Sequence, residues 1–441
     1  MQLLAQQIPT LRRSYGGVFT APIFTAPAPC GGNCFYCPST KGLPKSYVLN
    51  SATQAALAVG FSPARQFDKF VCRDNYFQTQ LPFEIIVLGG SFSGLDHYYR
   101  RSFLNELYSR MCKHESFVVE NIEEAPYRCS ILTVESRPDQ ITEEECRELR
   151  ALGVSKVELG VQHLQDAVLE VCGRGHRVDA VRKATRLLKT NGFKVGYHVM
   201  LGLPGSTAEL DDYMLCEKLW EAKYLPDFLK VYPCVILKDP ALQPELHKMM
   251  EKRTWSPPTE TYIRKRLKIL TEYVPRMVRI SRVQRYFPED QVIGGFVRGI
   301  RENNLGNCQC VRCREAGKVA SQMALDNFES TQFKTTKIGA DMYLEIVSNN
   351  DVLLALARVY KKNNTCSVLR ELHVYGQATP LGMRGPVQGR GLGTKLLCEA
   401  ERQVWMAGHT TLLVNAAHGA KSFFRKHGYV EMGEFYLGKK L

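Results

Sequence analysis

Strand-like and helix-like segments alternate between residues 18 and 232, and this alternation constrains the fold more than any other feature of the chain. Repeated strand–helix units predict a mainly parallel sheet with right-handed crossovers, either a partial barrel or an open sheet. In both arrangements, functional residues gather at the carboxyl ends of the strands. The predicted strands are 18–25, 84–88, 130–134, 156–160, 194–200 and 228–232, and the predicted helices are 96–112, 143–152, 178–191 and 208–222.

Three cysteines follow the first predicted strand in the spacing C-x3-C-x2-C. They are Cys30, Cys34 and Cys37, with Gly31 and Gly32 inside the run. Glycine tolerates positive φ, so this loop can wrap tightly. Three thiolates on one short loop suit a [4Fe–4S] cluster with one iron left open to bind a cofactor. The alternative is a structural zinc site that takes its fourth ligand from elsewhere.

With an aromatic residue before its last cysteine, the motif resembles that of the radical S-adenosylmethionine (SAM) superfamily. The resemblance implies that the methionine part of SAM chelates the open iron and that reductive cleavage gives a 5′-deoxyadenosyl radical. Gly89 and Gly90 match the glycine pair that meets the methionine amino group. Residues 201–205 resemble the glycine-rich turn after the fifth strand of that family.

The resemblance narrows to the catalytic subunit of Elongator and covers about residues 18–441. Segments 133–139, 157–162, 173–176, 192–198, 229–233 and 278–285 run as in that family. Glu135 and Arg137 lie at a strand end and are suited to grip a zwitterionic cofactor, although they could also form an ordinary surface ion pair. We place Gln162 with these cofactor-binding residues and Lys230 among the catalytic residues.

A second cysteine cluster has the spacing C-x-C-x2-C and basic flanks. Its members are Cys308, Cys310 and Cys313. Three thiolates this close hold zinc if a fourth ligand arrives, and the resemblance implies a structural zinc site. A metal-free turn and a second iron–sulfur cluster are the alternatives. The histidines that could supply a fourth ligand are His163, His176 and His198.

A different rhythm begins near residue 337. The predicted strands are 342–347, 352–360, 367–374 and 411–415, and the predicted helices are 392–407 and 420–427. The glycine loop at residues 388–394, before the first of these helices, resembles the acetyl-CoA pyrophosphate loop of the GNAT-type acetyltransferases. Backbone N–H groups and the helix dipole at such a loop favour an anion. Residues 371–376 match the Elongator strand beside the pantetheine arm. The residues expected to bind acetyl-CoA are Glu371, Leu372, His373, Val374, Val387, Gln388, Gly389, Arg390, Gly391, Leu392, Gly393, Thr394 and Phe424.

Two residues of this strand are further candidates for catalysis, and two positions depart from the family. Glu371 and His373 could do acid–base work, or could simply be strand residues. Phe424 belongs to a Phe-Phe pair where the family has two tyrosines, and phenylalanine cannot donate a hydrogen bond to a thioester oxygen. Pro82 stands where the family has a lysine, so that cationic contact to acetyl-CoA is missing.

The charge and the cysteine content indicate the partner and the compartment. A formal net charge of +14 favours a polyanionic partner such as nucleic acid. The 15 cysteines, without a secretory signal, indicate a reducing cytoplasm, and no apolar run is long enough for a membrane span. Lys230, Arg282, Arg285 and the run 264–266 could line a basic groove. The tyrosines that could stack a splayed base are Tyr232 and Tyr286.

We therefore expect an α/β protein with three parts. These are a radical SAM partial (β/α) barrel in residues 1–280, a basic linker with a Cys-rich zinc module in 281–325, and a GNAT-type α+β acetyltransferase domain in 326–441. The expected cofactors are a [4Fe–4S] cluster, SAM, acetyl-CoA and zinc.

The resemblance implies carboxymethylation at C5 of uridine 34 in the anticodon stem-loop of tRNA, with accessory Elongator-type subunits or self-association. One competing hypothesis is a protein lysine acetyltransferase whose radical domain is only structural. Another is a non-catalytic tRNA-binding paralogue. A third is another radical enzyme, such as a methylthiotransferase, against which the acetyltransferase-like third argues.

Overall fold

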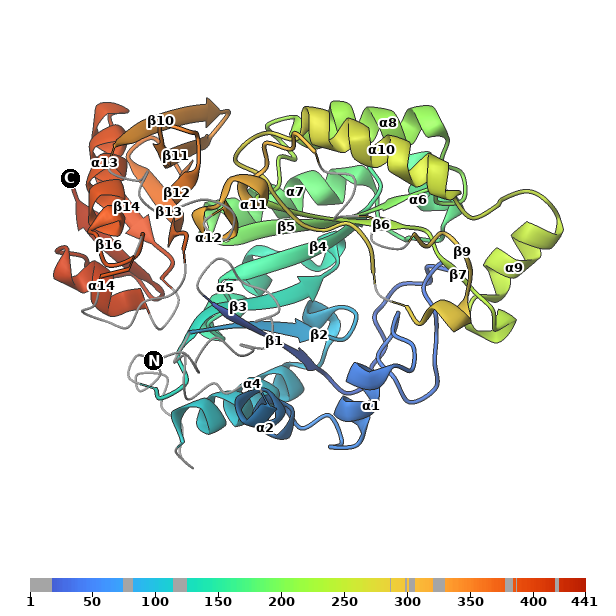
Figure 1. The fold of residues 1–441 in the computed structure, drawn as a ribbon. Coiled ribbons are helices and arrows are strands. Elements are labelled where there is room, and N and C mark those ends of the chain that lie inside the picture. Colours follow the sequence, from blue (N-terminus) through green and yellow to red (C-terminus); the bar gives the residue numbers. More distant parts are fainter. Residues whose placement is uncertain are drawn as a thin grey trace, which may run out of the picture.

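The computed structural model describes residues 18–73, 82–113, 125–285, 287–297, 300, 306–319, 330–376, 384–385, 387–416 and 420–441. These residues form two seven-stranded sheets and a two-stranded ribbon of β7 (Ile236–Leu237) and β9 (Val292–Gly294) (Figure 1). No helix in the described ranges has the length and apolar character that crossing a bilayer requires.

The first sheet is parallel throughout. Its strand order is β1-β2-β3-β4-β5-β6-β8, and every neighbouring pair runs in the same direction. This confirms the predicted partial barrel. The strands are β1 (Phe19–Phe24), β2 (Phe83–Leu88), β3 (Cys129–Ser136), β4 (Lys156–Gln162), β5 (Lys194–Leu201), β6 (Phe228–Pro233) and β8 (Arg279–Arg282).

Helices connect these strands on the outer side of the barrel (Figure 1). The Thr142 hydroxyl caps α5, since it accepts a hydrogen bond from the backbone N–H of Glu145 at 3.1 Å. The main helices are α2 (Pro63–Arg73), α4 (His97–Cys112), α5 (Glu143–Ala151), α6 (Asp166–Val171), α7 (Val178–Thr190), α8 (Ala208–Cys216), α9 (Pro244–Glu251) and α10 (Glu260–Tyr273).

The sequence did not predict strand β8, because the alternation of strands and helices breaks off from residue 275 onward. This strand pairs in parallel with β6, so the first sheet crosses the expected boundary between residues 280 and 281. The strand is short and begins and ends with arginine, so it lacks an apolar pattern. The short helix α11 (Val311–Arg314), which carries Cys313, contacts the residue before β8: Val311 N–H donates to the Val278 carbonyl at 3.0 Å.

The second sheet confirms the predicted antiparallel strands of the C-terminal third. Its order is β10-β11-β12-β13-β14-β16-β15, with β13 and β14 parallel. Their pairing ends at Leu369 and Val414, whereas β13 continues to Val374, so the two strands diverge. The elements are β10 (Thr331–Ile338), β11 (Asp341–Ser348), β12 (Leu353–Lys361), β13 (Cys366–Val374), α13 (Leu392–Met406), β14 (Thr411–Val414), α14 (Lys421–Lys426), β15 (Val430–Met432) and β16 (Tyr436–Lys440).

The C-terminal domain docks where the barrel strands begin (Figure 1). Arg370 of β13 donates to the carbonyl of Phe193, just before β5, at 3.1 Å and to Asp227, just before β6, at 3.0 Å. Asp341 of β11 accepts from Arg370 and from Lys189 of α7, each at 2.6 Å. These charged groups are buried, so a paired polar cluster joins the two domains.

Candidate functional site

A cavity that opens to the surface lies at the carboxyl ends of the barrel strands. It brings together residues from distant parts of the sequence, as the parallel sheet predicted. The predicted site residues among its lining are Cys30, Cys34, Cys37, Gly90, Glu135, Arg137, Gln162 and Lys230.

The cysteine loop follows β1 and forms one wall of this cavity. Cys34 is buried, and the backbone N–H of Cys37 donates to the Cys34 carbonyl at 3.1 Å. The Cys37 thiol and the Arg174 guanidinium lower the pKa of the Cys34 thiol to about 4, against the opposing effect of burial. All three cysteines face the cavity from one loop, which fits the predicted open cluster.

Glycine is required in this loop by close packing. A Cβ atom on Gly32 would lie 2.1 Å from Nη1 of Arg137. At the end of β2, a Cβ on Gly89 would lie 1.9 Å from Oγ1 of Thr25, and Gly90 has a φ of +102°. The backbone can therefore pack closely at both places.

Arg137 fits the carboxylate of a zwitterionic cofactor. Its Nε and Nη2 donate to Asp139 at 3.1 and 3.0 Å, and Nη2 also donates to the Arg174 carbonyl at 2.9 Å. Its buried Nη1 has no hydrogen-bond partner within the described part of the chain. A buried donor without a partner is costly, so an anionic group bound in the cavity would stabilise this side chain.

Glu135 and Gln162 lie at the ends of β3 and β4. The Glu135 carboxylate accepts from the Tyr47 hydroxyl at 3.4 Å, a long contact that leaves it able to bind an ammonium group. Gln162 has a φ of +67°, in the left-handed region, beside a break in the register between β4 and β5. Strained backbone in a residue that lines a cavity is typical of binding sites.

Charged side chains form the floor of the cavity. Alternate residues of β4 face the barrel interior, and Glu158 is one of them. Glu158 is buried and accepts from Nε2 of His198 at 2.9 Å and from Nζ of Lys230. Nζ of Lys156 lies 3.1 Å from its other oxygen. Burial alone would raise the pKa of Glu158, but Lys230 and Lys156 hold it well below its usual value.

Lys230 is an ammonium group in this structure. Burial lowers its pKa, but the nearby Glu158 carboxylate outweighs that effect and raises the pKa above its usual value. Lys230 can therefore donate hydrogen bonds into the cavity and stabilise negative charge, whereas it is poorly suited to act as a base. Of these floor residues, the sequence had selected Lys230 for the site and His198 only as a possible zinc ligand.

The three sulfurs of Cys308, Cys310 and Cys313 lie within 4.8 Å of one another. Their proximity fits a shared metal ion. Cys308 and Cys310 are buried and do not line the cavity, and their segment contacts β8, since Arg312 donates to the Ser281 carbonyl at 2.8 Å.

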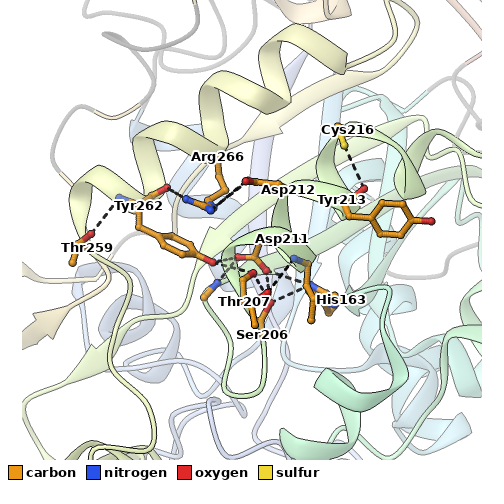
Figure 2. A network of polar contacts seen from close by, with 12 residues as sticks. His163, Ser206, Thr207, Asp211, Asp212, Tyr213, Cys216, Thr259, Tyr262 and Arg266 are labelled. Atoms are coloured by element: carbon orange, nitrogen blue, oxygen red, sulfur yellow. Dashed lines mark hydrogen bonds and ion pairs between the residues drawn. The ribbon is translucent and has the colours of Figure 1, made fainter.

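The histidines suggested as a fourth ligand all have partners elsewhere, so that expectation was wrong. Nε2 of His176 accepts from Nε of Arg174 at 3.0 Å, and His198 contacts the cavity floor. Nε2 of His163 lies 3.2 Å from Asp211 in a buried network (Figure 2). Within the described residues, no histidine joins the three sulfurs.

Figure 2 shows what His163 does instead. Asp211 also accepts from the Ser206 hydroxyl at 2.6 Å, the Tyr262 hydroxyl at 2.8 Å and the Gly202 backbone N–H at 2.8 Å. These contacts tie α8 and α10 to the glycine-rich turn after β5. The network therefore fixes the turn that the sequence matched to the radical SAM family.

The glycine loop of the C-terminal domain forms the start of α13. Gly389 and Gly391 both have a φ of +75°, and Gly391 is the cap residue before the helix. Arg390 donates to the Gly385 carbonyl at 3.0 Å, and Gln388 donates to the Val374 carbonyl of β13 at 3.3 Å. The loop thus sits where β13 and β14 diverge, with the N–H groups of a long helix available for a pyrophosphate.

Two residues expected at the acetyl-CoA site are placed differently. Phe424 is buried in the domain core, and it is the ring of Phe423 that lies 3.7 Å from a Cβ atom built on Gly393. Glu371 is ion-paired with Arg358 at 2.5 Å, on the side that faces the barrel. Its carboxylate is therefore committed to the domain interface, which argues against its predicted acid–base role.

The predicted basic groove is present only in part. Arg282 and Arg285 line the cavity, and the Arg285 guanidinium lies 4.3 Å from the centre of the Tyr47 ring. In contrast, Arg264 and Arg266 are paired with Glu260 and Asp212 on the helical side. The predicted stacking residue Tyr232 also lines the cavity. Tyr286 lies outside the described residues.

Comparisons with known proteins find two known domains in this chain. Residues 77–215 match the radical SAM superfamily, and residues 321–439 match the acetyltransferase (GNAT) domain. The tRNA uridine(34) acetyltransferase of Methanocaldococcus jannaschii is 32% identical, over 98% of this chain and 87% of its own length. Elongator complex protein 3 of Dictyostelium discoideum is 29% identical, over 97% of this chain and 83% of its own length.

A solved structure extends the similarity to three dimensions. The archaeal Methanocaldococcus infernus Elp3, with an N-terminal deletion, superposes with a TM-score of 0.82 at 28% identity, covering 97% of this chain and 100% of that one. Both the barrel and the acetyltransferase domain are included in that coverage. The chain therefore belongs to the radical SAM and GNAT family that includes the tRNA uridine(34) acetyltransferases and Elongator complex protein 3.

Proposed function

We propose that this chain modifies the wobble uridine of tRNA, adding a carboxymethyl group to C5 with acetyl-CoA as the carbon source and SAM as the radical source. The observation that carries the proposal is the cavity in which three cysteines meet Nη1 of Arg137, a buried donor for which the described residues offer no hydrogen-bond partner. The same chain has a GNAT domain with a glycine loop at the start of α13. Its relatives' names, tRNA uridine(34) acetyltransferase among them, support the choice of substrate.

The cavity residues have distinct tasks in this scheme. Cys30, Cys34 and Cys37 would hold the [4Fe–4S] cluster, while Nη1 of Arg137 binds the carboxylate of SAM and Glu135 binds its amino group. When bound, the reduced cluster and SAM supply the radical that takes a hydrogen atom from the acetyl methyl group. The pairing of Arg137 with Asp139 fixes its guanidinium before the cofactor arrives.

The charged floor would bind the uridine or the thioester. Lys230 is held as an ammonium by Glu158, and His198 is fixed by the same carboxylate. The Lys230 ammonium has further N–H groups that can donate to a carbonyl oxygen, whereas the Nε2–H of His198 is already donated to Glu158. Arg285 and Arg282 extend the positive charge to the mouth, where the phosphates of an anticodon loop would lie.

The acetyl-CoA end has an unusual wall. The helix start at Gly391 would take the pyrophosphate, and β13 with His373 would run beside the pantetheine arm. Phe423 packs against this loop but cannot donate a hydrogen bond to the thioester. Thioester hydrolysis in this chain must therefore use another donor, and His373 of β13 is one polar candidate.

We also infer a structural zinc ion at Cys308, Cys310 and Cys313, and action in the cytoplasm with tRNA as the partner. The proximity of the sulfurs supports the first inference. The thiol-rich composition and the net charge of +14 support the second. Accessory subunits or self-association would complete the assembly.

The test is anaerobic reconstitution of the full chain with iron and sulfide, followed by SAM, dithionite, acetyl-CoA and tRNA. Mass spectrometry should find 5′-deoxyadenosine and carboxymethyluridine at position 34, and neither when the tRNA carries cytidine there. Intact SAM and unmodified tRNA would refute the proposal. Acetylated protein formed without SAM would instead support the lysine acetyltransferase, and tRNA binding without SAM cleavage would support the non-catalytic paralogue.

A further inference from the structure

Arg174 contacts the cysteine loop, although the sequence alone gave no role to this residue. It lies in the turn between α6 and α7 and is only 5% exposed. Its Nη1 donates to Sγ of Cys34 at 3.3 Å. The sulfur stands for the thiolate that would bind iron, so Arg174 is a hydrogen-bond donor to a cluster ligand.

The rest of the Arg174 guanidinium is fixed by the protein. Nε donates to Nε2 of His176 at 3.0 Å, and Nη2 donates to the carbonyl of Gly160 at the end of β4 at 2.5 Å. Because all three nitrogens are occupied, the side chain cannot turn away from Cys34 without losing buried hydrogen bonds. The contact is therefore set by the sheet as well as by the cysteine loop.

The turn that carries Arg174 is packed directly on the cysteine loop. A Cβ atom on Gly173 would lie 3.0 Å from the Asn33 carbonyl and 3.1 Å from the Phe35 ring. The Arg174 carbonyl accepts from Nη2 of Arg137, the residue assigned to the cofactor carboxylate. One turn thus contacts both the cluster loop and the cofactor-binding arginine.

We propose that Arg174 is a positioning residue that raises the reduction potential of the cluster through its hydrogen bond to the Cys34 thiolate. When one electron from an external low-potential reductant enters the cluster, the total negative charge of the cluster and its three thiolates increases by one. A donated hydrogen bond and a fixed cation stabilise the more negative form. No proton or covalent bond is exchanged. The inference rests on the cluster of the proposed function and not on its tRNA substrate.

The test is a redox titration of the reconstituted full chain. The electron paramagnetic resonance signal of the reduced cluster is measured at each potential. R174M removes both the donor and the charge, whereas R174K keeps the charge but loses the fixed guanidinium. The matched control is R177M, since Arg177 lies in the same turn but is exposed. It changes the net charge equally.

The midpoint potential should fall in R174M, fall less in R174K and stay unchanged in R177M. An R174M protein with full iron content and the wild-type potential would overturn the proposal, as would an equal shift in R177M. If R174M binds too little iron, R174K decides by the same criterion. A wild-type cluster that titrates normally in a chain that leaves tRNA unmodified would refute the proposed function and leave this inference standing.

Discussion

The two cysteine clusters offer the same ligand atoms in opposite surroundings. Cys34 and its partners line an open cavity, next to a fixed guanidinium and an unpartnered arginine donor. The sulfurs of the second cluster, which includes Cys310, lie within 4.8 Å of one another, and none of its cysteines lines that cavity. The first cluster therefore lies beside a cavity that can take a cofactor, and among the described residues the second does not.

This contrast shows that cysteine spacing alone does not separate a reactive cluster from a structural one. What distinguishes them is the position in the fold, because the first cluster follows the carboxyl end of β1, where the parallel strands open into a cavity, whereas the helix of the second cluster contacts Val278, just before the start of β8. Changes at the first cluster should therefore abolish SAM cleavage and leave the stability of the fold nearly unchanged. Changes at the second cluster should lower the stability and leave the iron of the first cluster bound.

The largest effect is expected from C34S. Without this ligand the cluster cannot be held, so 5′-deoxyadenosine formation should fall to the level of the protein-free control, measured by liquid chromatography. The thermal unfolding of the metal-free protein should change little. Cleavage that persists would show that Cys34 is not a ligand, and C398S, at an exposed cysteine, is the control.

Next comes C310S, which probes the second cluster. Losing a structural metal ion should lower the free energy of unfolding by about 3 kcal/mol or more, seen as a lower Tm in calorimetry. A zinc chelator should have the same effect on the wild-type chain. The iron bound at the first cluster should remain, and a variant with normal stability but no SAM cleavage would reverse the roles assigned to the two clusters.

A smaller effect is expected from G32A. Its Cβ would lie 2.1 Å from Nη1 of Arg137 and push that donor away from the cofactor, so SAM binding should weaken about tenfold in equilibrium binding assays. The matched control is G306A, two residues before Cys308, where a Cβ would meet nothing within 4 Å. Equal losses in both variants would mean that the effect is not specific to the first loop.

The smallest effect concerns pH in the metal-free protein. Because the pKa of Cys34 is lowered to about 4, its thiolate is already formed at pH 6. Its alkylation rate should therefore change less than about twofold between pH 6 and pH 8, whereas an unperturbed cysteine gains about 80-fold. Peptide mass spectrometry measures both rates, and a steep rise at Cys34 would show that Arg174 and Cys37 do not stabilise its thiolate.

The barrel could be predicted from the sequence because its early strands alternate with helices. The cysteine motif also marks the end of the first strand. Strand β8 could not be predicted, since its arginines serve the cavity and the domain junction rather than an apolar face. Strand β10 was missed for a related reason. Most of its residues are exposed, and its sequence does not alternate apolar with polar residues.

The site was predicted where a motif names the residue and missed where only the fold brings residues together. Arg137 and Gln162 were selected from family motifs, and both line the cavity. Glu158 lay within a matched segment, but its role in fixing Lys230 depends on inward-facing residues of β4 and β6, two strands that β5 separates. Glu371 was misjudged because its partner, Arg358, lies on another strand.

The central claim is that the radical cavity and the acetyltransferase domain act in one reaction on tRNA. Acetyl-CoA with three deuterium atoms on its acetyl methyl group tests it most directly. With reconstituted full chain, SAM, reductant and tRNA, the 5′-deoxyadenosine should carry one deuterium and the modified uridine two. Modified tRNA formed together with unlabelled 5′-deoxyadenosine would contradict the account, because the hydrogen would then come from somewhere other than acetyl-CoA.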